Sequence, residues 1–435
     1  MQYRVEPSVL SGGTVTVPGD KSISHRALML SSIAEGTSRI SGFLAGEDCL
    51  ATLAALRSLG VRVDSESETT LVVHGVGLNG FNEPVAPLDM GNSGTAMRLF
   101  TGLLSGQAFN SRLVGDGSLS RRPMKRVIDP LEAMGARITS QNGLPPLIVH
   151  GSKGLKPVHY ALPVASAQVK SAILLAGLYA QGRTTVAEPA VTRDHTERML
   201  STMGVTVEVD AGRIGITGRQ KLHSADIRVP ADLSSAAFVI LAALISDEAE
   251  VLIKGVGVNP TRTGVIDVLR QMGGSIELEN PGLCGAEPIA DLRIRPSELR
   301  GIAVDPQLVS LAIDEFPVLF VAAAQAEGRT TFTGISELRV KESDRIAAMA
   351  TGLRNLGVPV SETPDGAEVR GGRLGGGTID SFGDHRIAMA FAVAGTAASQ
   401  PITILDTASV ATSFPGFAGC LRSIGAAIAG SEGAP

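Results

Sequence analysis

A short pattern of hydrophobic and small residues recurs six times along the chain. It consists of Leu, two variable residues, an apolar residue, Gly, a small residue, a variable residue, and Val or Ile. Leu and the apolar residue three positions later share one face of a helix, Gly can adopt the left-handed conformation after the last turn, and Val or Ile begins a strand. The pattern therefore predicts six helix ends and one structural unit used six times. Its glycines are Gly60, Gly135, Gly204, Gly273, Gly357 and Gly425.

A second hydrophobic pattern precedes each of these helix ends. It is an apolar segment rich in small residues, and the six clearest copies begin at Ser24, Gly94, Ser166, Ser234, Phe316 and His385. Because such segments are apolar nearly all round, we expect them to be buried helices, with strands between them and the amphipathic helices. Three units closing around their buried helices would form a domain with sheets outside. The predicted fold class is α/β with two domains of three repeats each.

Proline and glycine mark the expected passage between these two domains. We expect the hinge near 17–19 and 229–230, because the first and fourth repeats begin just after these positions. The domain with repeats one to three would span 18–228. The other, with repeats four to six, would be discontinuous and combine 1–17 with 229–435.

Composition limits the classes of function that suit this chain. It has 435 residues, 44% of them hydrophobic, so it can bury two substantial cores. Aromatic residues make up only 3% and Trp is absent, which indicates close packing of small side chains. The formal net charge of −5 argues against a general nucleic-acid binder, although it says nothing about a local basic cleft.

The cysteines and the chain start favour a cytoplasmic protein. Cys49, Cys284 and Cys420 are far apart and lack the spacing of metal ligands, so we expect packed, reduced thiols. The first residues lack the apolar core of a signal peptide, and no apolar run approaches the roughly 20 residues that a membrane span needs.

Polar residues gather at the starts of the apolar helices. Free backbone N–H groups and the positive end of the helix dipole favour anions there. If three such starts in each domain face one interdomain cleft, that cleft is cationic although the whole chain is acidic. Several Arg side chains, which bind carboxylate and phosphate with two prongs, indicate two anionic small-molecule substrates. The residues are Lys21, Ser22 and Arg26; Asn92, Ser93, Gly94, Thr95 and Arg98; Ser166, Gln168 and Lys170; Asp232, Ser234 and Ser235; Asp314 and Glu315; and Asp384, His385 and Arg386, with Arg122, Arg193, Lys341, Glu342 and Arg345 in further segments.

Simpler structural roles are open for several of these residues. Asp232 and Asp384 could serve only as helix caps. The segment 341–345 could be a solvated helix start held by local ion pairs. His195 and His385 could be structural hydrogen-bond donors, since nothing in the sequence places a nucleophile or metal beside them.

The order of these segments resembles the family of 5-enolpyruvylshikimate-3-phosphate (EPSP) synthases over essentially the full length. The resemblance implies two domains, each of three βαβαββ-type repeats. It also implies transfer of the enolpyruvyl group from phosphoenolpyruvate to the 5-hydroxyl of shikimate 3-phosphate, with release of phosphate and without a metal or other cofactor. The matching segments run from Pro18 to Arg26, Gly91 to Arg98, Arg122 to Met124, Ser166 to Gln168, Arg339 to Arg345 and Asp384 to Arg386.

The resemblance also assigns residues to the two substrates. It implies Asp314 and Glu342 as the acid and base, with Lys21 assisting, and it leaves open which carboxylate moves which proton. Contacts to shikimate 3-phosphate would come from Lys21, Ser22, Arg26, Ser166, Ala167, Gln168, Arg193, Asp314 and Lys341. Contacts to phosphoenolpyruvate would come from Lys21, Gly94, Arg122, Gln168, Arg345 and Arg386.

Four positions depart from the pattern of many family members and resemble its divergent bacterial subgroup. Ala167 stands where Ser is common, Arg193 where Tyr is common, Leu99 where Pro is common, and Thr412 where Lys is common. Gly94 leaves room for glyphosate, the inhibitor that mimics phosphoenolpyruvate, whereas tolerant members carry Ala there. The resemblance further implies a monomer without nucleic-acid or membrane partners.

Two other functions compete with this interpretation. UDP-N-acetylglucosamine enolpyruvyl transferases look similar in fold, but they typically have Lys-Asn at the position of Lys21-Ser22 and a reactive Cys in a loop corresponding to about 115–118. This chain has no Cys in that loop. A non-catalytic repeat scaffold would spread its charges evenly, whereas here they occupy different positions in different repeats.

Overall fold

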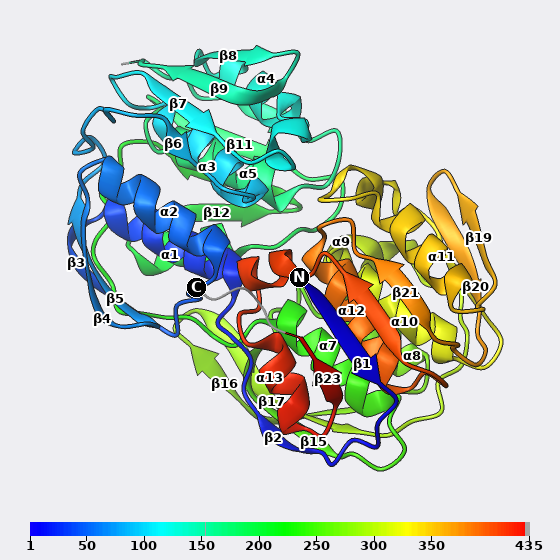
Figure 1. The fold of residues 1–435 in the computed structure, drawn as a ribbon. Helices are drawn as coiled ribbons and strands as arrows, with labels where there is room; N and C mark the ends of the chain where they lie inside the picture. The colour runs from blue at the N-terminus through cyan, green and yellow to red at the C-terminus, as the bar shows by residue number, and fades with distance from the viewer. Residues whose placement is uncertain (153, 431–435) are drawn as a thin grey trace. The chain divides into compact units, whose positions relative to one another are not determined.

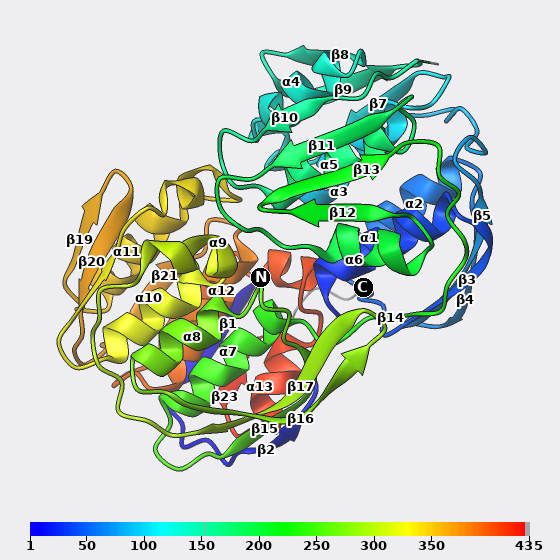
Figure 2. The ribbon, with the colours of Figure 1, turned by 180° about the vertical axis from the view of Figure 1, so that it is seen from behind.

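The computed structural model of the protein describes residues 1–152 and 154–430. Its elements are drawn in Figure 1 and, from behind, in Figure 2. The chain forms two compact units. Unit 1 comprises Met1–Asp20, Pro230–Leu283 and Pro288–Pro435, and unit 2 comprises Lys21–Val229 with Cys284–Glu287. The predicted α/β class and the repeated architecture are confirmed, since each unit contains three copies of one arrangement of helices and strands.

Unit 2 is built around three helices whose residues are mostly buried: α1 (Lys21–Ser32), α3 (Gly94–Leu104) and α5 (Ala167–Gly177). Its amphipathic helices are α2 (Glu47–Ser58), α4 (Lys125–Ala133) and α6 (His195–Thr202). Each of its described sheets has one parallel edge strand followed by three antiparallel strands. The strand orders are β14 (Ile227–Arg228), β3 (Glu35–Ser41), β5 (Thr70–Val76), β4 (Arg62–Ser67); β6 (Leu88–Asp89), β7 (Ser111–Val114), β9 (Leu144–His150), β8 (Arg137–Gln141); and β10 (His159–Ala161), β11 (Arg183–Ala187), β13 (Arg213–Thr217), β12 (Val207–Asp210).

Unit 1 repeats this plan, except that one of its described sheets has three antiparallel strands and lacks the parallel edge strand. Its buried helices are α7 (Leu233–Leu244), α10 (Phe316–Gln325) and α12 (His385–Thr396), and the others are α8 (Gly264–Gln271), α9 (Val309–Ala312), α11 (Arg345–Asn355) and α13 (Phe417–Ser423). The strand orders are β16 (Ser275–Cys284), β17 (Glu287–Arg295), β15 (Val251–Gly257), β2 (Gly13–Val15); β18 (Arg329–Phe332), β20 (Gly366–Arg370), β19 (Val360–Thr363); and β21 (Gly377–Asp380), β22 (Ile402–Leu405), β1 (Gln2–Glu6), β23 (Ala427–Ala429). The N-terminal β1 therefore completes the sheet of the last repeat, and in Figure 1 the blue strand lies beside the red one.

The six predicted helix ends are confirmed in atomic detail. Every glycine of the pattern has a left-handed backbone, with φ between 87° and 101°. After α2, the Gly60 N–H donates to the carbonyl of Arg57, and the Val61 N–H donates to the carbonyl of Leu56. This pair of hydrogen bonds defines a Schellman motif and satisfies carbonyls that the helix leaves open. Equivalent pairs close the other five helices.

Four of the repeats add a side-chain bond at the same place. The Arg after the patterned Leu donates to a backbone carbonyl six residues later, which ties the end of the helix to the strand that follows. The pairs are Arg57 with Val63 (2.9 Å), Arg270 with Ile276 (2.6 Å), Arg354 with Val360 (2.9 Å) and Arg422 with Ile428 (3.1 Å).

The two units have separate hydrophobic cores. One buried cluster lies within residues 23–229, and the other draws only on residues 3–17 and 233–428. Small residues let the buried helices approach closely: a methyl group on Gly102 of α3 would overlap the backbone carbonyl of Ala172 in α5. Within the described part of the chain, no helix is both long and apolar enough to cross a membrane.

Candidate active site

The start of α1 carries three of the predicted site residues. The ammonium group of Lys21 pairs with the carboxylate of Asp48, in the first turn of α2. Arg26, one turn further along α1, is 4% exposed, and its guanidinium donates to Thr196 Oγ1 (2.7 Å), Ser171 Oγ (2.8 Å) and the Ser22 carbonyl (2.9 Å). These bonds join the starts of α1, α5 and α6, because Ser171 lies in α5 and Thr196 in α6.

Arg193 and the starts of α3 and α5 belong to the same group. Arg193 precedes α6, and its Nη1 lies 3.5 Å from the hydroxyl of Ser22. Gln168, in the first turn of α5, accepts from Arg98 of α3 (2.7 Å) and donates to Thr95 Oγ1 (2.9 Å). Ser166 caps α5, where its hydroxyl accepts from the N–H of Val169. The structure therefore brings these predicted residues of unit 2 together at helix N-termini, where anions are favoured.

Arg122 lies beside the start of α3. It is 6% exposed, and its Nη2 donates to Asn92 Oδ1 (2.5 Å) and to Ser118 Oγ (3.3 Å). A methyl group on Gly94, the first residue of α3, would lie 3.2 Å from Arg122 Nη1 and 2.8 Å from Arg98 Nη1. Gly94 thus occupies a place where any side chain would press on two guanidinium groups.

Asp314 is the centre of the site residues in unit 1. Lys341 Nζ donates to its Oδ1 (3.1 Å), and Arg345 Nη1 lies 3.6 Å from the same oxygen. Arg386 donates from Nη1 to the Asp314 backbone carbonyl (2.9 Å) and approaches Oδ2 at 4.0 Å. Three cations therefore surround one carboxylate that precedes the buried helix α10.

Arg345 joins Asp314 to two further carboxylates. Its Nη2 donates to Glu342 Oε2 (2.6 Å), and its Nε donates to Asp384 Oδ2 (2.8 Å). Burial lowers the pKa of Arg345, but Asp384, Glu342 and Asp314 raise it above the ordinary value, so the group stays charged. At 1% exposure Arg345 does not fit the simpler interpretation of a solvated helix start, although the local ion pair with Glu342 that this interpretation expected is present.

A third cluster involves Arg262, which lies outside the segments that the sequence patterns marked. Its guanidinium contacts Asp20, Asp232 Oδ1 (3.1 Å) and Ser234 Oγ (2.6 Å), all buried in unit 1. Asp232 also caps α7 as the simpler interpretation expected. Burial and the nearby Asp20 raise the pKa of Asp232 to about 6, while Arg262 and Arg386 act in the opposite direction.

The remaining positions of interest have structural partners. His195 Nδ1 bonds to Glu287 (2.7 Å), which supports a structural role for this histidine. Asp384 caps α12 as well as pairing with Arg345. Thr412, where many family members carry Lys, ends the 3-10 helix η4 (Ala408–Thr412), is 5% exposed and donates to the carbonyl of Ser409 (2.7 Å).

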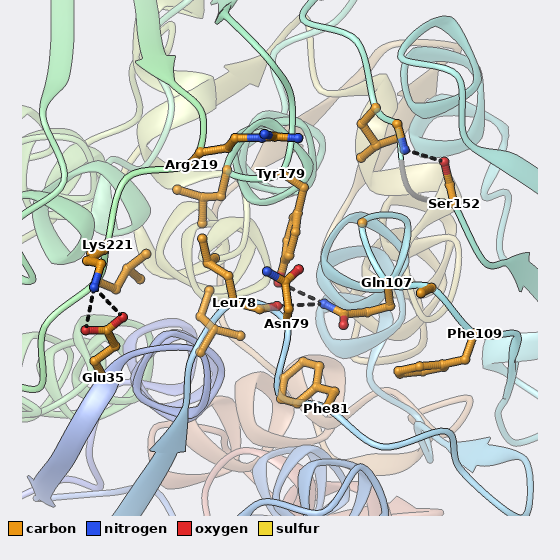
Figure 3. A pocket seen from close by; sticks show the side chains of 17 residues that line it. Glu35, Leu78, Asn79, Phe81, Gln107, Phe109, Ser152, Tyr179, Arg219 and Lys221 are labelled. Carbon is orange, nitrogen blue, oxygen red and sulfur yellow. Dashed lines mark hydrogen bonds and ion pairs between the residues drawn. The ribbon is translucent and has the colours of Figure 1, made fainter.

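A pocket of about 670 Å³ in unit 2 contains none of the predicted site residues (Figure 3). It lies just beyond the C-terminal ends of α1, α3 and α5, where Ile33, Gly106 and Leu178 are among its lining residues. Within it, Gln107 donates to the hydroxyl of Tyr179 (3.0 Å). The predicted residues lie instead around the N-terminal ends of the same helices.

The fold is that of a class of protein, the enolpyruvyl transferases. The chain matches the solved enolpyruvyl transferase NikO from Streptomyces tendae with a TM-score of 0.80, covering 100% of this chain and 99% of that one, and at 18% identity this match shows the fold alone. A solved EPSP synthase from Acinetobacter baumannii matches with a TM-score of 0.87 and 50% identity, covering 99% of this chain and 100% of that one.

Sequence comparison identifies the family. The family model for EPSP synthase (3-phosphoshikimate 1-carboxyvinyltransferase) matches residues 5–421. A protein named 3-phosphoshikimate 1-carboxyvinyltransferase from Methylococcus capsulatus is 58% identical and covers 95% of each chain. One of the same name from Alkalilimnicola ehrlichii is 58% identical and covers 96% of this chain and 94% of its own. The chain belongs to the EPSP synthase family, as the sequence resemblance predicted.

Proposed function

We propose that this protein transfers the enolpyruvyl group of phosphoenolpyruvate to the 5-hydroxyl of shikimate 3-phosphate and releases phosphate, a step of the shikimate pathway to aromatic amino acids. The observation that carries this proposal is the Asp314 carboxylate held by Lys341, Arg345 and Arg386 in a member of the EPSP synthase family. This arrangement supplies a carboxylate for proton transfer among cations suited to anionic substrates.

Shikimate 3-phosphate binds, in this proposal, mainly to residues of unit 2. Ser22, Ser166 and Gln168 lie at helix N-termini, and Arg193 adds a charge beside Ser22. Arg26 uses three of its N–H groups on protein oxygens, so it contributes charge and orients Ser22. Ala167, Lys21, Lys341 and Asp314 complete the set.

Phosphoenolpyruvate binds to the guanidinium groups of both units. In unit 2 it contacts Arg122, with Gly94 at the start of α3 giving it room. It also contacts Gln168 at the start of α5 and Lys21 at the start of α1. In unit 1 it contacts Arg345 and Arg386. Guanidinium groups suit this ligand because they bind carboxylate and phosphate oxygens in pairs.

The reaction needs a proton delivered to carbon and later removed from it, and a proton removed from the attacking hydroxyl. In the addition step a proton reaches the methylene carbon of phosphoenolpyruvate, while the 5-hydroxyl oxygen attacks the neighbouring carbon and gives up its proton. Phosphate then leaves as the new methyl group returns a proton. Asp314 and Glu342 act as the acid and base, and Lys21 assists protonation or phosphate departure.

We also propose that glyphosate competes at the phosphoenolpyruvate contacts, and that the protein acts as a monomer in the cytoplasm. The free thiols of Cys49, Cys284 and Cys420 suit a reducing compartment. Size-exclusion chromatography with light scattering tests the monomer, and inhibition competitive with phosphoenolpyruvate tests the inhibitor.

The test of function is phosphate release from purified protein given phosphoenolpyruvate with either shikimate 3-phosphate or UDP-N-acetylglucosamine. We expect release only with shikimate 3-phosphate. Release only with the sugar nucleotide would move the assignment to the rival transferase, and release with neither would favour a binding scaffold.

A pair of variants tests the role of Asp314. Asp314→Asn should lower kcat by roughly a hundredfold or more, because the amide cannot exchange the proton. Asp291→Asn is the matched control, since Asp291 lies in β17 with Lys254, Asn280 and Gly255 as partners and belongs to none of the clusters above. Equal kcat values for the two variants would contradict the assignment.

A further inference from the structure

Arg262 is a buried cation that the proposed reaction does not use. It lies in the turn between β15 and α8 and is 4% exposed. The side-chain oxygen of Asn259 shapes this turn by accepting from the N–H (2.9 Å) and hydroxyl (2.8 Å) of Thr261. The backbone carbonyl of Asn259 accepts from the N–H of Arg262 (2.8 Å). These bonds fix the backbone of Arg262, and the carboxylates around its guanidinium fix the side chain.

Three carboxylates share this one guanidinium. Nη1 pairs with Asp20, while Nη2 lies 3.1 Å from Asp232 Oδ1 and 3.9 Å from Glu315 Oε1. Such a cluster is costly to bury, and apolar residues of similar volume often stabilise a protein as well or better. Stability alone therefore does not account for this cluster. The segments that the cluster joins indicate what else it does.

Two of these carboxylates lie where the chain passes between the units. Asp20 is the last residue of unit 1 before Lys21, and Asp232 follows the return at Pro230. The two segments pair with each other, because the Asp20 N–H donates to the Pro230 carbonyl (2.8 Å) and the Asp232 N–H donates to the Pro18 carbonyl (2.9 Å). Arg262 thus fixes the backbone next to Lys21, the first residue of α1.

The third carboxylate leads to Asp314. Glu315 follows Asp314 in the chain, accepts from the hydroxyl of Ser234, and lies 3.6 Å from Arg386 Nη1. The same Arg386 nitrogen donates to the Asp314 carbonyl. A continuous buried network therefore runs within unit 1 from Arg262 to the backbone that carries Asp314.

We propose that Arg262 is a positioning residue for the transfer reaction, which sets the backbone beside Lys21 and beside Asp314 through one guanidinium. It touches neither substrate itself. The inference rests on the roles proposed above for Lys21 and Asp314. Its geometry requires arginine, because a planar fork can bridge several carboxylates whereas a lysine ammonium acts as a single point charge.

Arg262→Lys is the principal test, because it keeps the positive charge and removes the fork. We expect kcat per folded molecule to fall by roughly ten- to hundredfold, since a misplacement of about 1 Å has effects of this size. Both KM values should change by a smaller factor than kcat, because the contacts proposed for Arg122, Arg193 and Arg386 remain. The folded fraction is measured by circular dichroism at the assay temperature.

Arg270→Lys is the matched control. Arg270 lies eight residues later in α8, and its guanidinium donates from Nε (3.0 Å) and Nη2 (2.6 Å) to the carbonyl of Ile276. Its substitution should lower the unfolding temperature and leave kcat per folded molecule within about twofold of the wild type. A purely structural Arg262 would behave in the same way.

Asp20→Asn provides an independent test that leaves Arg262 with Asp232 and Glu315. It should lower kcat severalfold, and the double variant with Arg262→Lys should be less impaired than the product of the two single effects, because both act on one contact. If Arg262→Lys does not fold, the kcat of the Asp20→Asn protein tests the inference by itself.

Two results would overturn the inference. One is a wild-type kcat per folded molecule in the Arg262→Lys or Asp20→Asn protein. The other is additive effects in the double variant. A wild-type protein that released no phosphate would instead overturn the proposed function, and this inference with it, before any variant was compared.

Discussion

Gly94 is the residue where a single methyl group has the most specific expected effect. That group would lie 2.8 Å from Arg98 Nη1, so the Arg98 guanidinium must move and weaken its bond to Gln168. Gly94→Ala should therefore raise the KM for phosphoenolpyruvate. The resemblance to glyphosate-tolerant family members, which carry Ala at this position, further predicts a larger rise in the inhibition constant of glyphosate. Both constants are measured by steady-state kinetics. Equal factors would contradict the prediction.

At this scale the sequence indicated the positions of candidate residues where the signal was local. Lys21, Gly94 and Gln168 could be predicted because each opens a buried helix, and the structure places them there. Asp48 and Arg262 could not, because they reach their partners from other elements. A buried Arg in a turn has the same sequence appearance as an exposed one until the fold places carboxylates around it.

At the scale of a single element, the helix ends require glycine for its left-handed backbone conformation. Gly357 has a φ of 87°, and a methyl group there would meet no atom within 4 Å, so only the backbone conformation opposes a side chain. Gly357→Ala should lower the free energy of unfolding by about 1 kcal/mol without changing kcat. Urea denaturation measures the change.

Gly419 supplies the opposite case. It lies inside α13, its φ is outside the left-handed range, and a methyl group would again meet no atom within 4 Å. Gly419→Ala should raise the free energy of unfolding by about 0.5 to 1 kcal/mol, because alanine favours a helix. Two changes of the same sign would refute this account of the helix ends.

The sheet around β17 carries a pH dependence through Asp291. Burial raises its pKa, but hydrogen bonds from Lys254, Asn280 and the Gly255 N–H outweigh this and lower it to about 2. A lowered carboxyl pKa stabilises the fold above about pH 4, and this contribution is lost as pH falls towards 2. Asp291→Asn should therefore lower the free energy of unfolding by about 1 kcal/mol at pH 7, with solvent screening included.

The pH series provides the check on that prediction. The difference in urea midpoint between Asp291→Asn and the wild type should shrink as the pH is lowered from 7 to 3. A difference that stays constant or grows would show that hydrogen-bond geometry, and not the charge of Asp291, stabilises this sheet.

Elements formed by local contacts could be predicted from the sequence, and pairings across long separations could not. The buried helices and helix ends follow from spacing within about ten residues. By contrast, β1 pairs with β22 and β23 some 400 residues away, and β14 pairs with β3. Nothing in the five residues of β1 indicates which partner strands complete its sheet.

At the scale of the whole molecule, the two cores share no residue. A fragment of residues 21–229 contains every residue of one core and the three sheets around it, so it should fold alone with a cooperative urea transition. The fragment should be less stable than the same unit within the whole protein, because His195 and Arg198 lose their bonds to Glu287 and Ala286. Circular dichroism during urea titration tests this, and a gradual loss of signal without a transition would contradict it.

The three cations around Asp314 have a consequence for selectivity. Each of these cations already has a carboxylate counter-ion in the protein. These counter-ions are Asp314, Glu342 and Asp384. An incoming anion therefore exchanges with a carboxylate instead of filling an empty site, and only the difference between the two attractions drives binding. A doubly charged phosphate group should displace a resident carboxylate more readily than a metabolite with a single carboxylate does. We therefore expect the resident acids to lower the affinity of the proposed site for abundant singly charged anions.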